Sequence, residues 1–350
     1  MFIVFFSIKP FSCICYYFQI QTNKTMNTTR PCGCKGHRSC AVCEADFGIV
    51  GAKPVWLDNK DRIYYYDLGG DNLKIETLGL SGLQVIPEFI SKEEEIALVK
   101  DMDALPWDKS QSGRRKQNYG PKTNFKKKKV KIGEFKGFPQ TTKYIQDRFS
   151  TVDLLAGYRT VEQCSIEYTP ETGSSIDPHI DDCWIWGERI VQLNLLSSTY
   201  LALKPYTGNH DRYNLKDVES YPATIHNGSV VHNPVVGKLF DKPYTFSRNY
   251  NQQEKTGAHT YIENNEKKDP ENKVKNTDQS EFMVKIPLPP RSLLIMYGNS
   301  RYEWEHAVLR QDISDRRLII AYRELTPPYL PSGKQQDEGV EILEQANKFW

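Results

Sequence analysis

The sequence has 350 residues, a formal net charge of +2 and a hydrophobic fraction of 39%. A chain of this length forms about two structural units and buries a sizeable core, and so small a net charge argues neither for nor against a nucleic-acid partner. There are eight cysteines. Four of them lie within residues 32–43 and the others are scattered, which excludes a regular disulfide framework and favours a reducing compartment.

The first 30 residues are predicted to be a leader that does not belong to the folded domains. Residues 1–18 are largely apolar and aromatic, but they lack the basic start of a signal peptide, and Lys9 and Pro10 interrupt the apolar run. Because Met26 stands just before the cysteine-rich stretch, residues 1–25 fit an upstream reading-frame extension, a targeting segment or a disordered leader. No later run reaches the roughly 18–20 apolar residues of a membrane-spanning helix, so we expect no membrane insertion.

Residues 31–50 form a cysteine-rich module. Cys32, Cys34, Cys40 and Cys43 place four thiols in twelve residues, and the glycines among them permit the tight turns that a tetrahedral metal site needs. A structural zinc ion is one interpretation, and a flexible, reduced tail is the other. Either form would serve structure or partner binding.

Helices are expected on both sides of a basic stretch. Ser91 and Glu94 form a capping-box signature, and apolar residues then recur at helical spacing as far as Met102. A second helix is predicted after Pro139, over residues 143–149. The spacing of the apolar residues predicts that these helices pack against a sheet.

Residues 114–131 are the most basic part of the chain, with nine lysines or arginines and no acidic residue. Tyr119 and Phe125 are interleaved with the cations, a pattern that suits a phosphate backbone with a stacked base. It equally suits an acidic protein surface. The third interpretation is a solvated loop kept open by charge repulsion.

The rest of the chain favours strands. Short apolar or alternating runs predict them at 55–83, 163–168, 189–196, 282–286, 292–297 and 317–322. Trp184 and Trp186 lie on one face if the strand extends to them, and we expect core packing rather than a place at a substrate entrance. The predicted fold class is therefore mainly β with flanking helices (α+β), with a double-stranded β-helix (jelly-roll) core.

Two further segments complete the organisation. Residues 205–281 are polar and lack periodicity, which predicts a long insertion between strands. Four histidines lie in or near it and are expected at the surface rather than as metal ligands: His210, His226, His232 and His259. Residues 331–350 are predicted to form a tail helix, because Ile342, Leu343, Ala346 and Phe349 recur at helical spacing.

The most informative motif is His179-x-Asp181, followed far downstream by His306. Residues two apart on a strand point to the same side, so His179 and Asp181 can hold one ion together. Two histidines and one carboxylate leave neighbouring coordination positions open, which is the ligand set of non-haem Fe(II) oxygenases. We therefore predict that these three residues bind iron and that catalysis acts through it.

A pair of arginines follows. Arg317 and Arg323 are an even number of positions apart, so in a strand both guanidinium groups face one side. The rigid fork of an arginine suits a bidentate grip on a carboxylate. A dicarboxylate co-substrate would complete the site, with one end on iron and the other on an arginine.

At these residues the chain resembles the AlkB family of Fe(II)- and 2-oxoglutarate-dependent dioxygenases and, more closely, its homologue-four branch. Four stretches carry the resemblance: Cys32–Glu44, Arg114–Pro121, Ile176–Arg189 and Arg301–His306. It covers roughly residues 31–200 and 282–349, so we predict an AlkB-like dioxygenase domain over residues 51–330 with the insertion at about 205–281. It is weakest in that insertion.

The resemblance implies specific roles. 2-Oxoglutarate is expected to pair with Arg317 through its distal carboxylate, while Arg323 reinforces that pocket or faces the substrate. Tyr168 matches a family position near the co-substrate, although an ordinary core tyrosine is the competing interpretation. The asparagine that the family has just before that tyrosine is absent, since Ser165-Ile-Glu stands there. The basic stretch corresponds to the family's substrate-covering lid.

The resemblance also implies a reaction and its partners. The expected reaction uses O2 to convert 2-oxoglutarate to succinate and hydroxylates an N-methyl group, which then leaves as formaldehyde. The branch is associated with a methylated lysine on actin and with N6-methyladenine in DNA, and both remain open, with the modest net charge favouring the protein. We accordingly expect a cytoplasmic and nuclear protein. The alternative is a non-catalytic partner- or nucleic-acid-binding protein with a vestigial iron site.

Overall fold

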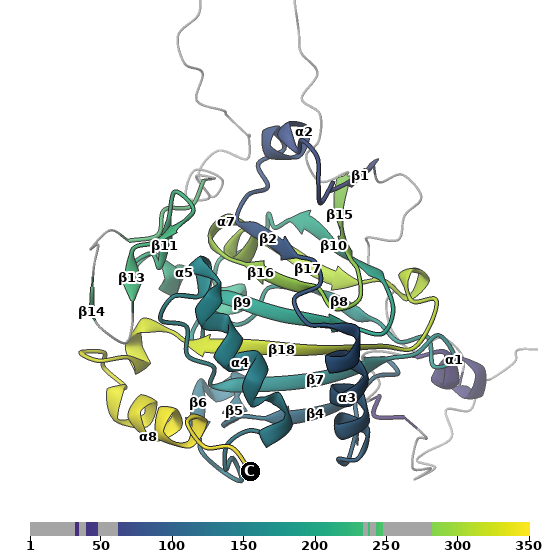
Figure 1. Ribbon diagram of the computed structural model, residues 1–350. Coiled ribbons are helices and arrows are strands. Elements are labelled where there is room, and N and C mark those ends of the chain that lie inside the picture. The colour runs from purple at the N-terminus through teal and green to yellow at the C-terminus, as the bar shows by residue number, and fades with distance from the viewer. Residues whose placement is uncertain (1–31, 35–39, 48–61, 234–236, 239–242, 248–281) are drawn as a thin grey trace, which may run out of the picture. The chain divides into compact units, whose positions relative to one another are not determined.

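The computed structural model describes residues 32–34, 40–47, 62–233, 237–238, 243–247 and 282–350, which all belong to one compact unit spanning residues 31–350 (Figure 1). The predicted leader, residues 1–30, lies outside the described residues. Two large sheets dominate the described part of the chain, with helices beside them, which confirms the predicted mainly β fold class.

The two sheets are largely antiparallel. The first has five strands in the order β1 (Arg62–Tyr65), β15 (Phe282–Leu288), β10 (Thr199–Pro205), β17 (Trp304–Val308) and β8 (Ile176–His179). The second has seven, in the order β2 (Leu83–Ile86), β16 (Leu293–Met296), β9 (Trp186–Leu195), β18 (Arg317–Leu325), β7 (Glu162–Tyr168), β4 (Arg115–Tyr119) and β3 (Asp108–Lys109). Only β1 and β15 run parallel among these neighbours. Three small hairpins pair β5 (Lys122–Asn124) with β6 (Lys129–Lys131), β11 (Ile225–His226) with β12 (Ser229–Val230), and β13 (His232–Asn233) with β14 (Gly237–Lys238).

The main core lies between the two sheets. Ile319 and Ala321 of β18 pack there, together with Leu203 of β10 and Val284 of β15 in the opposite sheet. The alternate residues of β18, such as Ile320, pack on the other face. Because successive side chains of a strand point to opposite faces, a slip of one residue in β18 would move Arg317 and Arg323 out of the space between the sheets.

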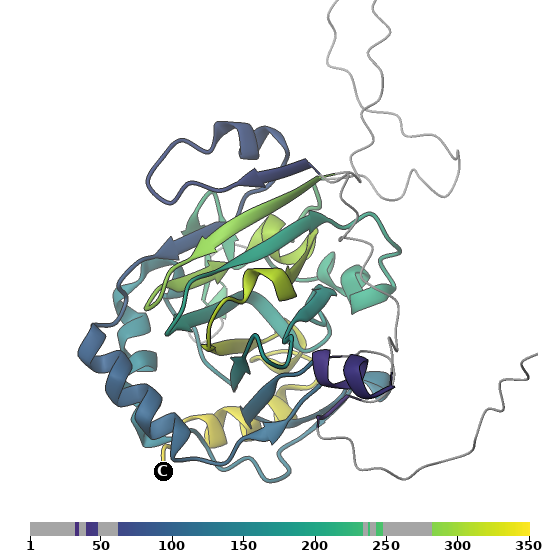
Figure 2. The same cartoon turned by 90° about the vertical axis from the view of Figure 1, so that its right-hand side faces the viewer.

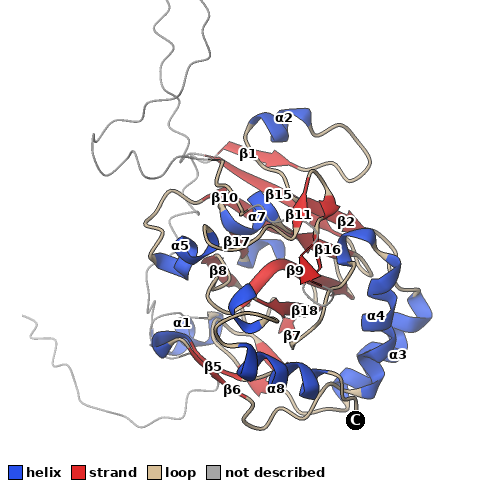
Figure 3. Ribbon diagram, turned by 90° about the vertical axis from the view of Figure 1, so that its left-hand side faces the viewer, coloured by secondary structure: helices blue, strands red, loops and turns tan. Residues whose placement is uncertain are grey.

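Helices cover the outer face of the seven-stranded sheet. The longest is α3 (Lys92–Asp103), whose start at Ser91 has both hydrogen bonds of the predicted capping box. It lies beside α4 (Lys143–Arg148), which follows a 3₁₀ turn at Gln140–Thr142 and confirms the second predicted helix (Figures 1 and 3). An ion pair between Arg148 and Glu94 joins the two helices.

The remaining helices are short or peripheral: α1 (Ala41–Phe47), α2 (Leu73–Thr77), α5 (Leu215–Val218), α7 (Gly298–Tyr302) and α8 (Gln336–Ala346). Of these, α8 lies in the predicted tail and contacts β6. After it the chain runs beside residues 137–140, where Phe138 N donates to Lys348 O over 2.9 Å and Trp350 N donates to Phe138 O over 3.0 Å. No helix among the described residues is both long and apolar enough to cross a membrane.

Of the three interpretations of the basic stretch, the solvated loop does not describe its first part, because residues 115–119 form β4 within the large sheet; the β5–β6 hairpin that follows is largely exposed. One predicted boundary needs correction. The predicted strand at 189–196 begins earlier, at Trp186, whereas Trp184 lies in the turn before it. Both tryptophans are buried in the core between the sheets, which confirms the core-packing interpretation.

The predicted polar insertion is partly folded. Tyr206, Leu215, Val218 and Tyr221 are buried in a small apolar cluster with Ile180, next to the metal-ligand motif. Sparse apolar residues without periodicity gave no strand or helix signal, yet they pack because the core offers them a complementary surface. The hydrophilic stretch 264–276 lies outside the described residues.

Candidate active site

The two predicted iron-binding histidines are brought together by strand pairing. β8 and β17 are antiparallel neighbours, and His179 and His306 are directly opposed in their register. Their ring centroids are 4.3 Å apart. His306 is also opposite Leu203, a residue of the core between the sheets, so both imidazoles lie on the inner face of the five-stranded sheet.

Asp181 lies just beyond the end of β8 and is buried. Its Oδ1 accepts a hydrogen bond from Nη2 of Arg323 over 3.0 Å, while its Oδ2 has no hydrogen-bond partner among the described residues. A buried carboxylate oxygen without a partner is costly unless something binds it. One oxygen of Asp181 is therefore available to a cation.

The protonation states suit metal binding. Burial lowers the pKa of His179, and burial together with the neighbouring His179 places the pKa of His306 well below its usual value. Burial alone would raise the pKa of Asp181, but Arg323 and the two histidines hold it below its usual range. At neutral pH the site therefore offers two neutral imidazoles and one carboxylate, a donor set that fits Fe(II).

Backbone contacts hold the ligand-bearing segments in place. Nδ1 of His179 lies 2.8 Å from the carbonyl oxygen of Asp177, a partner that fixes the ring and leaves Nε2 for a metal. Arg301 is fully buried and donates to the carbonyl oxygens of Asp181, Trp186 and Gly187 over 2.9, 3.0 and 3.1 Å. The guanidinium of Arg301 thus fixes the chain between β8 and β9. The stretch Arg301–His306 did not reveal this role in the sequence.

Arg317 is a buried cation without a carboxylate. It is opposite Tyr168 in the register of β18 and β7, and its guanidinium lies over that ring at 5.1 Å from the centroid. Nε donates to Oδ1 of Asn194 over 2.6 Å, but neither Nη1 nor Nη2 has a hydrogen-bond partner among the described residues. Burial lowers the pKa of Arg317 to about 10, so it remains charged at neutral pH. Two parallel donors that are desolvated and unpaired fit a carboxylate ligand.

Arg323 lies on the same face of β18, as its even spacing from Arg317 predicted, but in a different environment. Its Nη1 donates to Glu162 over 2.5 Å, and its Nη2 donates to Asp181. Although burial alone would lower the pKa of Arg323, these two carboxylates raise it. Arg323 therefore links a metal-ligand residue to Glu162, a residue that the sequence did not single out.

Asn194 was also missed, and the sequence does contain a signal for it. It is one of two amides in the apolar run Ile190–Leu196, and unlike Gln192 it is fully buried. Its Nδ2 donates to the carbonyl oxygens of Ser197, Leu288 and Pro289, which leaves Oδ1 to orient Arg317. A fully buried amide requires such a network.

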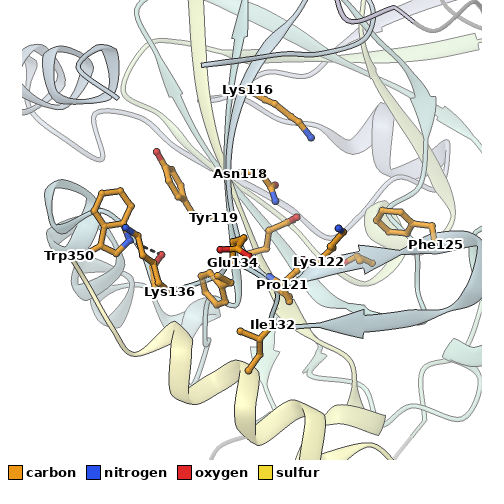
Figure 4. A pocket seen from close by; sticks show the side chains of 15 residues that line it. Lys116, Asn118, Tyr119, Pro121, Lys122, Phe125, Ile132, Glu134, Lys136 and Trp350 are labelled. Atoms are coloured by element: carbon orange, nitrogen blue, oxygen red, sulfur yellow. Dashed lines mark hydrogen bonds between the residues drawn. The ribbon is translucent and has the colours of Figure 1, made fainter. Parts of the chain in front are cut away.

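A cavity of about 550 Å³ lies between β4, the β5–β6 hairpin and Trp350 (Figure 4). Three lysines line it, Lys116, Lys122 and Lys136, and the ammonium of Lys136 is 4.3 Å from the centroid of the Trp350 ring. Glu162 also lines the cavity, so a chain of ion pairs leads from it through Arg323 to Asp181.

The folded part of the insertion contacts the segments next to the metal-ligand residues. Tyr213 accepts a hydrogen bond at its carbonyl from Cys183 N over 2.8 Å, and its hydroxyl donates to Glu305 over 2.7 Å. Cys183 and Glu305 stand close to Asp181 and His306 in the sequence. His210 and His226 are half-buried and belong to no cluster of metal-ligand side chains found among the described residues.

The four predicted zinc ligands are gathered at a separate place. The thiol sulfurs of Cys32, Cys34, Cys40 and Cys43 all lie within 4.8 Å of one another. Among the described residues, this is the one group of metal-ligand side chains whose ligand atoms are so closely spaced. The ligand atoms of His179, Asp181 and His306 are further apart.

Comparison with known proteins places the chain in a family. The human protein named alpha-ketoglutarate-dependent dioxygenase alkB homolog 4 is 36% identical over 336 residues, which cover 93% of this chain and 96% of that protein. The mouse protein of the same name is 35% identical over 325 residues, with 91% and 94% covered. A Caenorhabditis elegans protein named DNA N6-methyl adenine demethylase is 27% identical over 346 residues, with 90% and 94% covered. No family model matches the chain. At this identity and coverage the chain belongs to the AlkB family of Fe(II)- and 2-oxoglutarate-dependent dioxygenases.

Proposed function

We propose that this protein is an oxidative N-demethylase in which His179, Asp181 and His306 bind Fe(II) and Arg317 binds the distal carboxylate of 2-oxoglutarate. The observation that carries the proposal is the buried, charged and unpaired fork of Arg317 in the space between the sheets. The two opposed histidines face the same space. We also propose that the two sheets form the double-stranded β-helix core of the family.

The side chains bind and orient rather than transfer protons. The bound iron and 2-oxoglutarate supply the oxidising chemistry, with O2 as oxidant, succinate as co-product and formaldehyde as the fate of the methyl group. Asn194 holds Nε of Arg317, which leaves Nη1 and Nη2 as the donors that would bind the distal carboxylate of 2-oxoglutarate. The ring of Tyr168 packs against the Arg317 guanidinium and would support it in that position. Arg301 fixes the turn that carries Asp181.

For the substrate we propose an N-methyl group on a partner with an acidic surface, first of all a methylated lysine on a protein such as actin. The basic residues that line the cavity beside Glu162 support an acidic partner. Glu134 gives the same cavity a carboxylate that suits a methylated ammonium, while the carboxylate of Glu162 is already paired with Arg323.

N6-methyladenine in DNA is the second candidate. It is favoured by the combination of lysines with Tyr119, Phe125 and Trp350 around the cavity, because cations hold phosphates and aromatic rings stack on bases. A relative also bears the name of a DNA N6-methyl adenine demethylase. Either substrate is consistent with the proposed location in the cytoplasm and nucleus. The four-cysteine cluster is proposed to hold structural zinc, which takes no part in the reaction.

The test is succinate formation by the full chain with Fe(II), 2-oxoglutarate and ascorbate. Methyl-lysine peptides, methylated actin and N6-methyladenine DNA are offered in parallel, and formaldehyde is measured with each. We expect one substrate to accelerate succinate formation, and Asp181→Ala to abolish it. Asp337→Ala, at an exposed position on α8, is the matched control.

The outcomes separate the hypotheses. Formaldehyde release with the peptide or actin selects the protein substrate, and release with the DNA selects the nucleic acid. Folded, iron-loaded protein that shows no Asp181-dependent turnover with any substrate would instead support the non-catalytic partner-binding alternative.

A further inference from the structure

The four-cysteine cluster has the dimensions of a site for a single metal ion. Cys40 and Cys43 are fully buried and Cys34 nearly so, while Cys32 is half-buried. In a tetrahedral zinc site with Zn–S bonds of about 2.3 Å, the sulfurs lie about 3.8 Å apart. The four sulfurs all lie within 4.8 Å of one another, and the Cys32 and Cys43 sulfurs, which are 3.0 Å apart, would separate slightly to hold one such ion. An iron–sulfur cluster places several irons and sulfides between its cysteines and spreads them further.

The residues around the cluster have little apolar core of their own. Residues 32–34 and 40–47 contain one short helix, α1, and their apolar cluster consists of the four cysteines and Val42. So small a core does not stabilise a folded segment by itself, whereas a structural zinc ion contributes folding free energy directly.

The cysteine module docks on the dioxygenase core through specific contacts. Ala41 N donates to the carbonyl oxygen of Thr172 over 2.9 Å. Arg310 donates two hydrogen bonds to Glu44, over 2.7 and 3.0 Å. Gly33 lies so close to the β3–β4 turn that a Cβ there would be 2.6 Å from Ser110 O, which explains the glycine.

These contacts fall on the connections next to the active-site strands. Thr172 lies between β7 and β8, the strand that ends at His179, and Arg310 follows β17, which carries His306. Thr172 Oγ1 donates to Gly113 O over 2.9 Å, and this ties the β7–β8 turn to the start of the basic strand β4. The cysteine module therefore lies where three segments distant in the sequence meet: the start of β4, the β7–β8 connection and the residues after β17.

We propose that Cys32, Cys34, Cys40 and Cys43 bind one zinc ion, and that this zinc keeps the module clamped over the ends of β4, β8 and β17. The site is closed, because four thiolates leave no position for a substrate. Its role is to hold the connections that precede His179 and follow His306. This proposal is independent of which methyl group the enzyme removes.

Metal analysis of the full chain is the test. We expect about one zinc per chain after the iron site has been stripped with a mild chelator, and about one again in Asp181→Ala, which lacks only the other metal site. Cys40→Ser and Cys43→Ser should lose most of the zinc, whereas Cys164→Ser, a buried cysteine of β7 outside the cluster, should keep it. Cobalt(II) in place of zinc should give the strong visible absorption of a thiolate complex.

A second measurement does not depend on whether the cysteine variants fold. Titration of the wild-type thiols with an organomercurial should release zinc in step with four thiols, and should increase hydrogen exchange at the amides of Ala41 and Ser175. Ser175 N donates to Ser112 O beneath the module. A folded chain that holds no zinc, or that holds iron with sulfide, or whose four cysteines are paired as disulfides, would overturn the proposal.

Discussion

Two arginines of one strand, Arg317 and Arg323, show how similar positions acquire different roles. Both lie on the inner face of β18, where Arg317 is fully buried and Arg323 is partly buried. Arg323 sits between two carboxylates, whereas the terminal nitrogens of Arg317 have no partner among the described residues. A neutralised arginine stabilises the structure around it, while an unneutralised one keeps its binding capacity for a ligand. The same substitution at each position should therefore have opposite consequences.

The largest effect is expected for Arg323→Gln. It leaves the carboxylates of Asp181 and Glu162 buried without their cation, which typically costs about 3–5 kcal/mol. We expect the free energy of unfolding of the metal-free protein to fall by about this amount, as measured by urea denaturation. Unchanged stability would mean that the two ion pairs contribute little.

Arg317→Gln should act on the co-substrate instead. It removes an uncompensated buried charge, so the stability of the ligand-free protein should be unchanged or higher, while the affinity for 2-oxoglutarate should fall about 100-fold. Calorimetric titration with 2-oxoglutarate checks this. Arg316→Gln is the matched control, because Arg316 is the partly exposed neighbour that pairs with Asp103 and Glu167. Equal losses in both variants would contradict a specific role for Arg317.

Asn194→Asp should give Arg317 an environment like that of Arg323. The new carboxylate beside Nε gives Arg317 the neutralisation that Arg323 already has, so 2-oxoglutarate must compete with it and its affinity should fall about 10-fold. The variant also loses the Nδ2 donor, so its thermal unfolding is recorded in parallel. The Fe(II) requirement should not change. A large shift in that requirement would place Asn194 at the metal instead.

The smallest effect is expected for Tyr168→Phe. The ring under the Arg317 guanidinium remains and only the hydroxyl is lost, so the affinity for 2-oxoglutarate should fall by less than about 10-fold. Titration under the same conditions as for Arg317→Gln measures it. A loss as large as that of Arg317→Gln would make the hydroxyl, rather than the ring, the main contact.

The cysteine module offers a contrast of its own with the proposed iron site. The His and Asp residues come from strand ends far apart in the sequence, and one of them is held by Arg323. The cysteines come from one short stretch, and their sulfurs are already close together. A local motif can form a closed structural site, whereas a site assembled from distant strands depends on the whole fold.

The sequence by itself determined the local features. Apolar runs predicted β7, β9 and β18, but not the strands β8 and β17 that carry His179 and His306. The capping box predicted where α3 begins, and even spacing predicted that Arg317 and Arg323 share a face. The His179-x-Asp181 motif indicated the metal chemistry. Each of these follows from the period of a strand or helix, which neighbouring residues set among themselves.

Tertiary structure alone decided the partners. The register of β8 against β17 placed His306 opposite His179. The pairing of β18 with β7 and β9 gave Arg317 the amide of Asn194 as a partner but no carboxylate. Arg323 on the same strand is neutralised by Glu162 and Asp181. It also packed Tyr213, from an apparently featureless insertion, against both ligand segments. Spacing shows which face a side chain occupies, but its pairing and charge depend on residues that only folding brings near.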